Sequence, residues 1–133
     1  MLFGQEHVDR YIATDGAEGH DWRGTTSLIL TTIGSRSGEP RDAPLIYQPH
    51  DGAYVVVASK GGAPKHPAWY TNLVANPRVQ VQVWGDRFDA VARTAHGEER
   101  AELWRKMNER YSGFDDYSAR TTREIRLFVL DPR

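Results

Sequence analysis

The sequence predicts a mainly β fold, a small antiparallel barrel with helices at its periphery. The chain has 133 residues, the size of one domain, so we expect a single domain over residues 1–133. Five strand-like segments follow one another with connections of hairpin scale, and a further strand closes the chain. The early strands are too close together in sequence to be joined by the crossover helices that a parallel sheet requires.

Three strands are expected in the first half of the chain. They follow a polar segment in which Val8, Tyr11 and Ile12 are spaced as one face of a short helix. The strand-like segments are rich in β-branched and apolar residues, whereas Gly, Pro, Ser and Asp gather between them. We place these strands at residues 25–33, 41–48 and 53–59. The second and third strands are joined by a hairpin turn at Pro49–Gly52.

The second half contains two helices and three strands. Pro67 suits the first position of a short helix, and the Asn76-Pro77 pair ends that helix. The longest helix is expected over residues 98–110, because acidic residues open this segment and basic residues close it. The residues spaced to form its buried face are Ala101, Trp104, Met107 and Tyr111. The strands expected here are residues 79–83, 87–94 and 123–130.

Composition excludes several classes of function. Hydrophobic residues make up 39% of the chain and charged residues 26%, which is typical of an ordinary globular protein. Cysteine is absent, which excludes disulfides, iron–sulfur clusters and cysteine nucleophiles and favours a cytoplasmic location. The formal charge of −1 gives no attraction to nucleic acid, and no segment is typical of a membrane span or signal peptide.

The sequence also lacks the motifs of several catalytic mechanisms. The five histidines are scattered, so no metal site is expected, and no nucleophile elbow, Walker loop or dinucleotide-binding glycine motif is present. Demanding chemistry would therefore need a cofactor.

Two basic loops are candidates for binding an anion. The segment Ser35–Gly38, with Arg41 just beyond, combines flexible glycines, hydroxyls and guanidinium groups, which predicts either a phosphate clamp or an ordinary solvated turn. The segment Ala58–Asn72 lies in an acid-free stretch and leads from a strand end into a helix amino terminus. There Trp69 offers a flat surface for a ring, the alternative being a covering loop with core aromatics. A third candidate, Tyr111, Phe114 and Tyr117, is either core or the wall of a substrate pocket.

Several spaced motifs together resemble one known family. They are Leu30–Gly34, Arg36–Gly38, Pro40-Arg41, Ser59–Gly62, Pro67–Leu73 and Asn76-Pro77. In this order they are similar to the deazaflavin-dependent nitroreductase family of actinobacteria, over nearly the whole chain. The resemblance implies a split β-barrel of the FMN-binding type and, as cofactor, the 8-hydroxy-5-deazaflavin called coenzyme F420, with FMN the less favoured alternative.

The resemblance also implies roles for particular residues. The coenzyme's phosphate would be held by Ser35, Arg36 and Ser37, and the strand beside the ring would be lined by Arg41, Asp42, Ala43, Pro44, Leu45 and Ile46. The deazaflavin itself would be contacted by Val57, Ala58, Ser59 and Lys60, and Lys65 would meet its glutamate tail. The helix start that closes over it would be Ala68, Trp69, Tyr70, Thr71 and Asn72, and the substrate side would be walled by Tyr111, Phe114 and Tyr117.

This chain departs from the family pattern at three places. Ser35 replaces a basic residue that is common in the phosphate loop. Ile46 and Phe114 lie where some members have tyrosines, which weakens the expectation of nitroimidazole reduction. The start of the chain lacks the longer hydrophobic leader of some relatives, which argues against membrane attachment.

The expected function is oxidoreduction, with hydride passing from the reduced deazaflavin to a quinone, enone or nitroaromatic acceptor. Ser59, Tyr111 and Tyr117 are the candidate catalytic residues, because their hydroxyls can stabilise negative charge that develops on the acceptor. Two alternatives stay open, a deazaflavin-binding or storage protein without turnover and a reductase that uses FMN. The sequence leaves open the physiological acceptor and the choice between monomer and homodimer.

Overall fold

The structure is a computed structural model of the chain, and it describes residues 2–22, 24–58, 67–110 and 125–133. Three helices and seven strands are described. In chain order they are α1 (Gly4–Ala13), β1 (Asp21–Trp22), β2 (Thr25–Ile33), β3 (Pro40–His50), β4 (Ala53–Val57), α2 (Ala68–Ala75), β5 (Arg78–Val83), β6 (Asp86–Thr94), α3 (Gly97–Arg110) and β7 (Leu127–Pro132).

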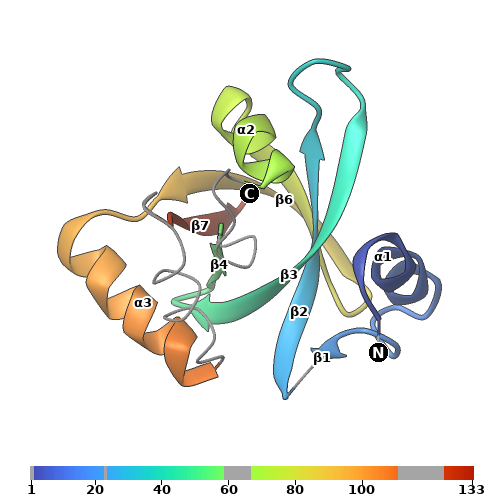
Figure 1. Cartoon of the computed structure of the whole chain (residues 1–133), viewed down its shortest axis with the longest axis horizontal. Helices are drawn as coiled ribbons and strands as arrows, with labels where there is room; N and C mark the ends of the chain where they lie inside the picture. Colours follow the sequence, from blue (N-terminus) through green and yellow to red (C-terminus); the bar gives the residue numbers. More distant parts are fainter. Residues whose placement is uncertain (1, 23, 59–66, 111–124) are drawn as a thin grey trace.

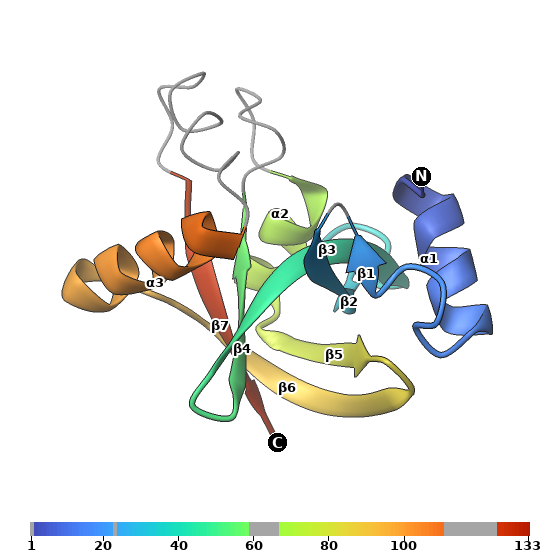
Figure 2. The same cartoon turned by 90° about the horizontal axis from the view of Figure 1, so that it is seen from below.

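Six of the strands close into an antiparallel barrel. The order around the sheet is β2-β3-β4-β7-β6-β5, and β5 returns to pair with β2 through Ile29–Gln82, Leu30–Val81 and Thr31–Gln80. The short β1 pairs with the start of β2. Figure 1 and Figure 2 show α1 and α3 on opposite sides of this barrel, with α2 beside the far end of β2. The expected fold class, a small antiparallel barrel with peripheral helices, is confirmed.

The barrel is filled by side chains that alternate along its strands. Val79, Val81 and Val83 of β5 point into one buried cluster with Phe128 of β7. The strands β4 and β7 are buried on both faces, because the residues between their barrel-facing positions pack against α3. Each large apolar side chain buried in this way contributes about 1.5–3 kcal/mol to folding.

The structure corrects the predicted buried face of the long helix. Leu103 and Met107 of α3 are buried against β4 and β7, Trp104 packs at their margin, and Ala101 is exposed. Leu103 and Met107 are one helical turn apart and supply more apolar area than alanine. The last expected face residue, Tyr111, lies outside the described residues. None of the described helices combines the length and the apolar character that crossing a membrane requires.

Several element boundaries also differ from the prediction. The strand expected over residues 41–48 runs from Pro40 to His50, so the β3–β4 turn shortens to Asp51-Gly52 with positive φ at both residues. The last strand begins at Leu127 and extends to Pro132. Pro67 precedes α2 as its N-cap instead of occupying its first position. Backbone pairing with neighbouring strands, which local composition does not specify, sets these limits.

Buried polar contacts attach α1 to the barrel. The hydroxyl of Tyr11 donates to the carbonyl of Ser27 at 3.0 Å and accepts the backbone N–H of Trp84 at 2.9 Å. Burial raises the pKa of Tyr11 to about 12, although the N–H of Trp84 opposes the shift. Val8 and Tyr11 are buried against Ile29, as the spacing of the helix face predicts, with Ile12 at the margin.

Candidate functional site

The β2–β3 hairpin and the start of α2 enclose a cavity of about 440 Å³. We call it the hairpin cavity. Its lining residues come from the hairpin turn, the start of β3 and the first turns of α2. They are Gly34, Ser35, Arg36, Ser37, Arg41, Asp42, Ala43, Ala68, Trp69 and Asn72. All of these except Gly34 are residues for which the sequence predicts a role in cofactor binding, and the fold brings them together from segments about thirty residues apart.

The side chain of Asn72 joins α2 to the hairpin. Its Oδ1 accepts the backbone N–H of Ser35 at 3.0 Å, and its Nδ2 donates to Oγ1 of Thr32 at 3.1 Å. Asn72 is buried and Thr32 is completely so, which makes both bonds costly to lose. This pair of bonds fixes the position of the turn relative to the helix start.

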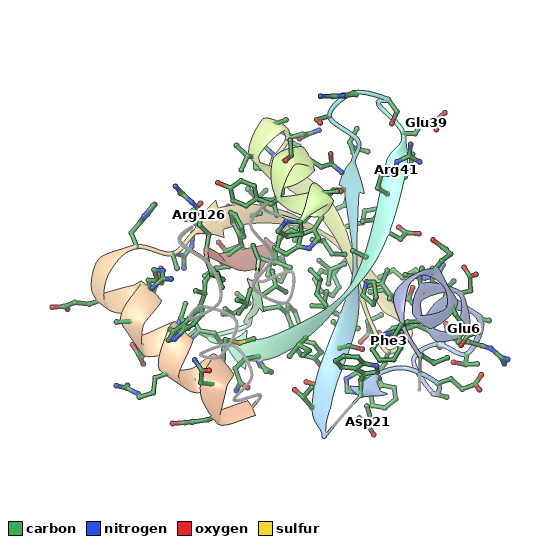
Figure 3. The ribbon with its side chains drawn as sticks, in the orientation of Figure 1. Phe3, Glu6, Asp21, Glu39, Arg41 and Arg126 are labelled. Atoms are coloured by element: carbon green, nitrogen blue, oxygen red, sulfur yellow. The ribbon has the colours of Figure 1, made fainter. Side chains whose placement is uncertain are left out.

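The hairpin turn is shaped by two glycines. Gly38 has a φ of +72°, which glycine adopts without steric cost. A Cβ on Gly34 would lie 2.5 Å from Oγ of Ser37 and 3.3 Å from the carbonyl oxygen of Glu39, so a larger residue there would displace the Ser37 hydroxyl. That hydroxyl accepts the N–H of Glu39 at 3.2 Å and a guanidinium N–H of Arg41 at 3.4 Å. Figure 3 shows Glu39 and Arg41 close to the tip of the hairpin.

Hydrogen-bond donors remain available around the hairpin cavity. Among the described residues, the backbone N–H groups of Arg36 and Ser37 have no hydrogen-bond partner. Pro67 supplies no side-chain cap, and the N–H of Tyr70 donates to the carbonyl of Pro67 at 3.0 Å. Among the described residues this leaves the N–H groups of Ala68 and Trp69, which line the cavity, without a partner. Free N–H groups of a turn and of a helix amino terminus are the donors that bind phosphate in proteins.

The charge of the hairpin cavity favours an anion. Two exposed guanidinium groups, Arg36 and Arg41, line it together with one carboxylate, Asp42. The carboxylate accepts a hydrogen bond from the hydroxyl of Thr31 at 2.6 Å. The remaining balance is positive, and guanidinium groups pair with phosphate through two hydrogen bonds at once.

The structure does not bring five of the other described site residues into the lining of the hairpin cavity. Pro44, Leu45 and Ile46 continue along β3 and line a second, smaller cavity beside α1. Val57 and Ala58 are buried at the end of β4, where the N–H of Ala58 donates to the carbonyl of Arg126 at 2.9 Å.

The aromatic residues of α2 pack mainly against the hydrophobic core. Trp69 is 8% exposed and meets Phe128 edge to face, with ring centroids 5.9 Å apart. Tyr70 is half-buried against the same phenylalanine, and Thr71 is exposed. Trp69 therefore forms a wall of the hairpin cavity and presents little ring surface for stacking.

Six predicted site residues lie outside the described residues, namely Ser59, Lys60, Lys65, Tyr111, Phe114 and Tyr117. Conversely, sequence reasoning missed Thr32, because a buried threonine in a β-branched strand carries no local signal of its bond to Asn72. It also missed Phe3, His7 and Trp22, which line the cavity beside α1, since their approach to β3 depends on the tertiary fold.

A larger cavity, of about 800 Å³, is lined by residues of β2, β5 and β6. Ile33, Arg78 and Arg133 are among its lining residues, and no residue of the predicted site is. We therefore place the candidate site at the hairpin cavity, where free donors and positive charge coincide.

The fold and the candidate site together define a small antiparallel β-barrel protein with a basic β2–β3 hairpin that Asn72 joins to α2. Residues 3–132 match the family described as F420H(2)-dependent quinone reductase, and the chain belongs to this family. This confirms the resemblance to deazaflavin-dependent reductases that the spaced motifs carry.

Individual relatives agree with this assignment. The chain is 40% identical over 131 residues to an F420H(2)-dependent quinone reductase of Mycobacterium tuberculosis strain H37Rv, and the match covers 96% of this chain and 88% of the relative. A solved structure of an F420-H2 dependent reductase is 41% identical, with a TM-score of 0.74, 82% of this chain covered and 95% of that one. A solved domain-swapped dimer is 39% identical with a TM-score of 0.77, and the coverage is 95% and 92%.

Proposed function

We propose that this protein is an oxidoreductase that uses reduced coenzyme F420 to convert a quinone into a hydroquinone, and that the hairpin cavity holds the phosphate of the coenzyme. Membership of the quinone reductase family over residues 3–132 supports the enzyme class, the cofactor and the acceptor. The observation that carries the placement is the convergence, at one cavity, of the nine predicted residues from the hairpin and α2.

The residues present fit a phosphate group. The N–H groups of Arg36 and Ser37 are free donors, two guanidinium groups supply positive charge, and α2 presents its amino terminus to the same space. The Asn72 bonds hold these donors in place before the coenzyme arrives, which lowers the entropic cost of binding.

The coenzyme, when bound, supplies the hydride, and the protein supplies orientation and a polar environment. The quinone gains a hydride and a proton, and its carbonyl oxygens become hydroxyls. Negative charge develops on an acceptor oxygen during this step, and a hydroxyl donor stabilises it. We assign that role to Ser59, Tyr111 and Tyr117, and we expect Val57, Ala58 and Lys60 to border the ring and Lys65 to meet the glutamate tail.

We extend the proposal to further acceptors, to the location of the protein and to its oligomeric state. Enones and nitroaromatic compounds also accept a hydride at an electron-poor carbon or nitrogen, so we propose them as secondary acceptors after quinones. We propose a cytoplasmic location, since the chain is free of cysteine. The related domain-swapped dimer shows that a chain of this kind can form dimers, and we keep both monomer and homodimer as candidates here.

The test is a turnover assay under anaerobic conditions. The protein is mixed with reduced F420 and 2-methyl-1,4-naphthoquinone, and the oxidised coenzyme is followed by its fluorescence. We expect saturable oxidation above the uncatalysed rate, and a much slower reaction with reduced FMN. Tight F420 binding with no oxidation across a panel of quinones would instead establish a binding or storage protein.

A further inference from the structure

Three exposed side chains set the charge of the hairpin cavity. Arg36 and Arg41 contribute guanidinium groups, and Asp42 contributes a carboxylate. Among the described residues, none of these three groups takes part in an ion pair, so no neighbour cancels their charges. Because the other lining residues are not charged, the lining carries one net positive charge.

The sheet holds the carboxylate of Asp42 at the edge of this cavity. Asp42 lies directly opposite Thr31 in the β2–β3 ladder, and the hydroxyl of Thr31 donates to its Oδ1 at 2.6 Å. The neighbours of Asp42 along β3, Arg41 and Ala43, also line the hairpin cavity. Asp42 further lines an adjoining cavity of about 270 Å³ together with Arg87. Strand pairing therefore keeps one negative charge beside the space in which we expect the phosphate.

A negative charge at this position is not required by the fold. The bond from Thr31 needs only an acceptor oxygen, which the uncharged amide of asparagine also offers. A carboxylate beside two guanidinium groups weakens their attraction for any anion. The charge of Asp42 is therefore best explained by the kind of anion that the cavity admits.

The two cofactors that the sequence leaves open differ in the charge of their phosphate. In F420 the phosphate joins the deazaflavin side chain to the glutamate tail, so it is a diester with a single negative charge. In FMN the phosphate is a monoester, and such a group carries about 1.5 to 2 negative charges at pH 7. A monoanion balances the net charge of the cavity lining, whereas a dianion leaves a negative charge uncompensated beside Asp42.

We propose that Asp42 is a specificity-determining residue, whose carboxylate selects the singly charged phosphodiester of F420 and disfavours the doubly charged phosphate of FMN. This inference rests on the proposed function, which places a phosphate in the hairpin cavity. Arg36 and Arg41 attract both phosphates, and Asp42 adds a repulsion that grows with the charge of the ligand. Binding sites commonly gain specificity from such a repulsive group in addition to their attractive ones.

Two flavins isolate the effect of phosphate charge. FMN is compared with riboflavin cyclic phosphate, a diester that has the same ring system and one negative charge. The titrations are done at low ionic strength and at about pH 8, above the second pKa of a phosphate monoester, which is about 6. Each Kd is measured by fluorescence on the whole protein, and F420 is titrated beside the two flavins.

The variants change one charge at a time. Asp42→Asn removes the charge and keeps an acceptor for the hydroxyl of Thr31, and Asp42→Lys reverses the charge. The matched control is Glu39→Gln, which removes a carboxylate from the same hairpin. Glu39 is exposed close to the hairpin tip and does not line the cavity (Figure 3).

Asp42→Asn should lower the Kd of FMN about fivefold and that of riboflavin cyclic phosphate about twofold, because the dianion is relieved of twice the repulsion. Asp42→Lys should lower the same constants about 20-fold and about fourfold. The Kd of F420 should change as that of the cyclic phosphate does. Glu39→Gln should leave the ratio of the two flavin constants unchanged.

An unchanged ratio in both Asp42 variants, or an equal shift of the ratio in Glu39→Gln, would overturn the role of Asp42. The proposed function would then still stand, provided that Arg36→Ala weakens F420 binding. If neither Arg36→Ala nor the Asp42 variants alter the binding of any ligand, the placement of the phosphate and the role of Asp42 both fail. A ratio that the Asp42 variants change, in a protein that does not oxidise reduced F420, would support the role of Asp42 and overturn the proposed turnover.

Discussion

The hydrogen bonds of Asn72 predict that one substitution lowers both the stability of the protein and its affinity for F420. Asn72→Ala removes the acceptor of the Ser35 N–H and the donor to the buried hydroxyl of Thr32. Two such bonds and one buried oxygen left without its donor amount to about 2–3 kcal/mol. For a domain of this size we expect Tm to fall by about 6–10 °C. The affinity for F420 should also fall, by about tenfold, because the hairpin is no longer held in its binding geometry.

The control for this prediction is Asn76→Ala, at the residue that caps the C-terminal end of the same helix. The Oδ1 of Asn76 accepts only the nearby N–H of Arg78, at 3.2 Å, in a partly exposed position, so its loss should cost less than about 1 kcal/mol and leave F420 binding unchanged. Thermal unfolding and fluorescence titration with F420 measure the two effects separately. A lowered Tm with an unchanged Kd for F420 in Asn72→Ala would refute the claim that Asn72 positions the phosphate-binding turn.

Three further predictions concern charge, pH and packing. The Kd of F420 should rise from low to physiological ionic strength, where charges are screened over about 8 Å, because Arg36 and Arg41 are exposed; a salt-independent Kd would argue against ion pairing. The pKa of Tyr11 is about 12 in the folded protein and about 10 in the unfolded chain. Its neutral hydroxyl therefore makes its full contribution to the free energy of unfolding below pH 10, and about 3 kcal/mol of that free energy should be lost as the pH rises through 12. Denaturant titrations should show this loss reduced in Tyr11→Phe. Leu103→Ala should cost about 2–5 kcal/mol in the same assay, whereas the exposed Ala101→Ser should cost only its difference in helix propensity, about 0.5 kcal/mol.

Local sequence patterns predict the strands and the turn chemistry well, since these depend on neighbouring residues. The valines of β5 alternate with polar residues, which predicts a strand with one buried face, and the glycines of the β2–β3 segment predict a turn. The hairpin and α2 were both predicted to bind the coenzyme, but only the resemblance to a family joined them into one site.

Long-range contacts account for what the sequence does not predict. The bond between Thr32 and Asn72 joins residues forty positions apart, and β1 exists only because Asp21 and Trp22 can pair with the start of β2. The buried face of α3 depends on which side chains meet β4 and β7, and no spacing rule separates Leu103 from Ala101 before the helix is docked. The smaller cavity beside α1 likewise arises from the approach of α1 to β3.

The placement of the phosphate is tested most directly by comparing two ligands. Arg36→Ala is titrated with F420 and with the deazaflavin chromophore that lacks both phosphate and glutamates, beside the wild-type protein. A lost charge-assisted contact to phosphate should weaken F420 binding by about 1.5–3 kcal/mol, or about 10- to 150-fold, and leave the affinity for the bare chromophore unchanged. Equal loss for both ligands, or no loss for F420, would contradict a phosphate bound in the hairpin cavity.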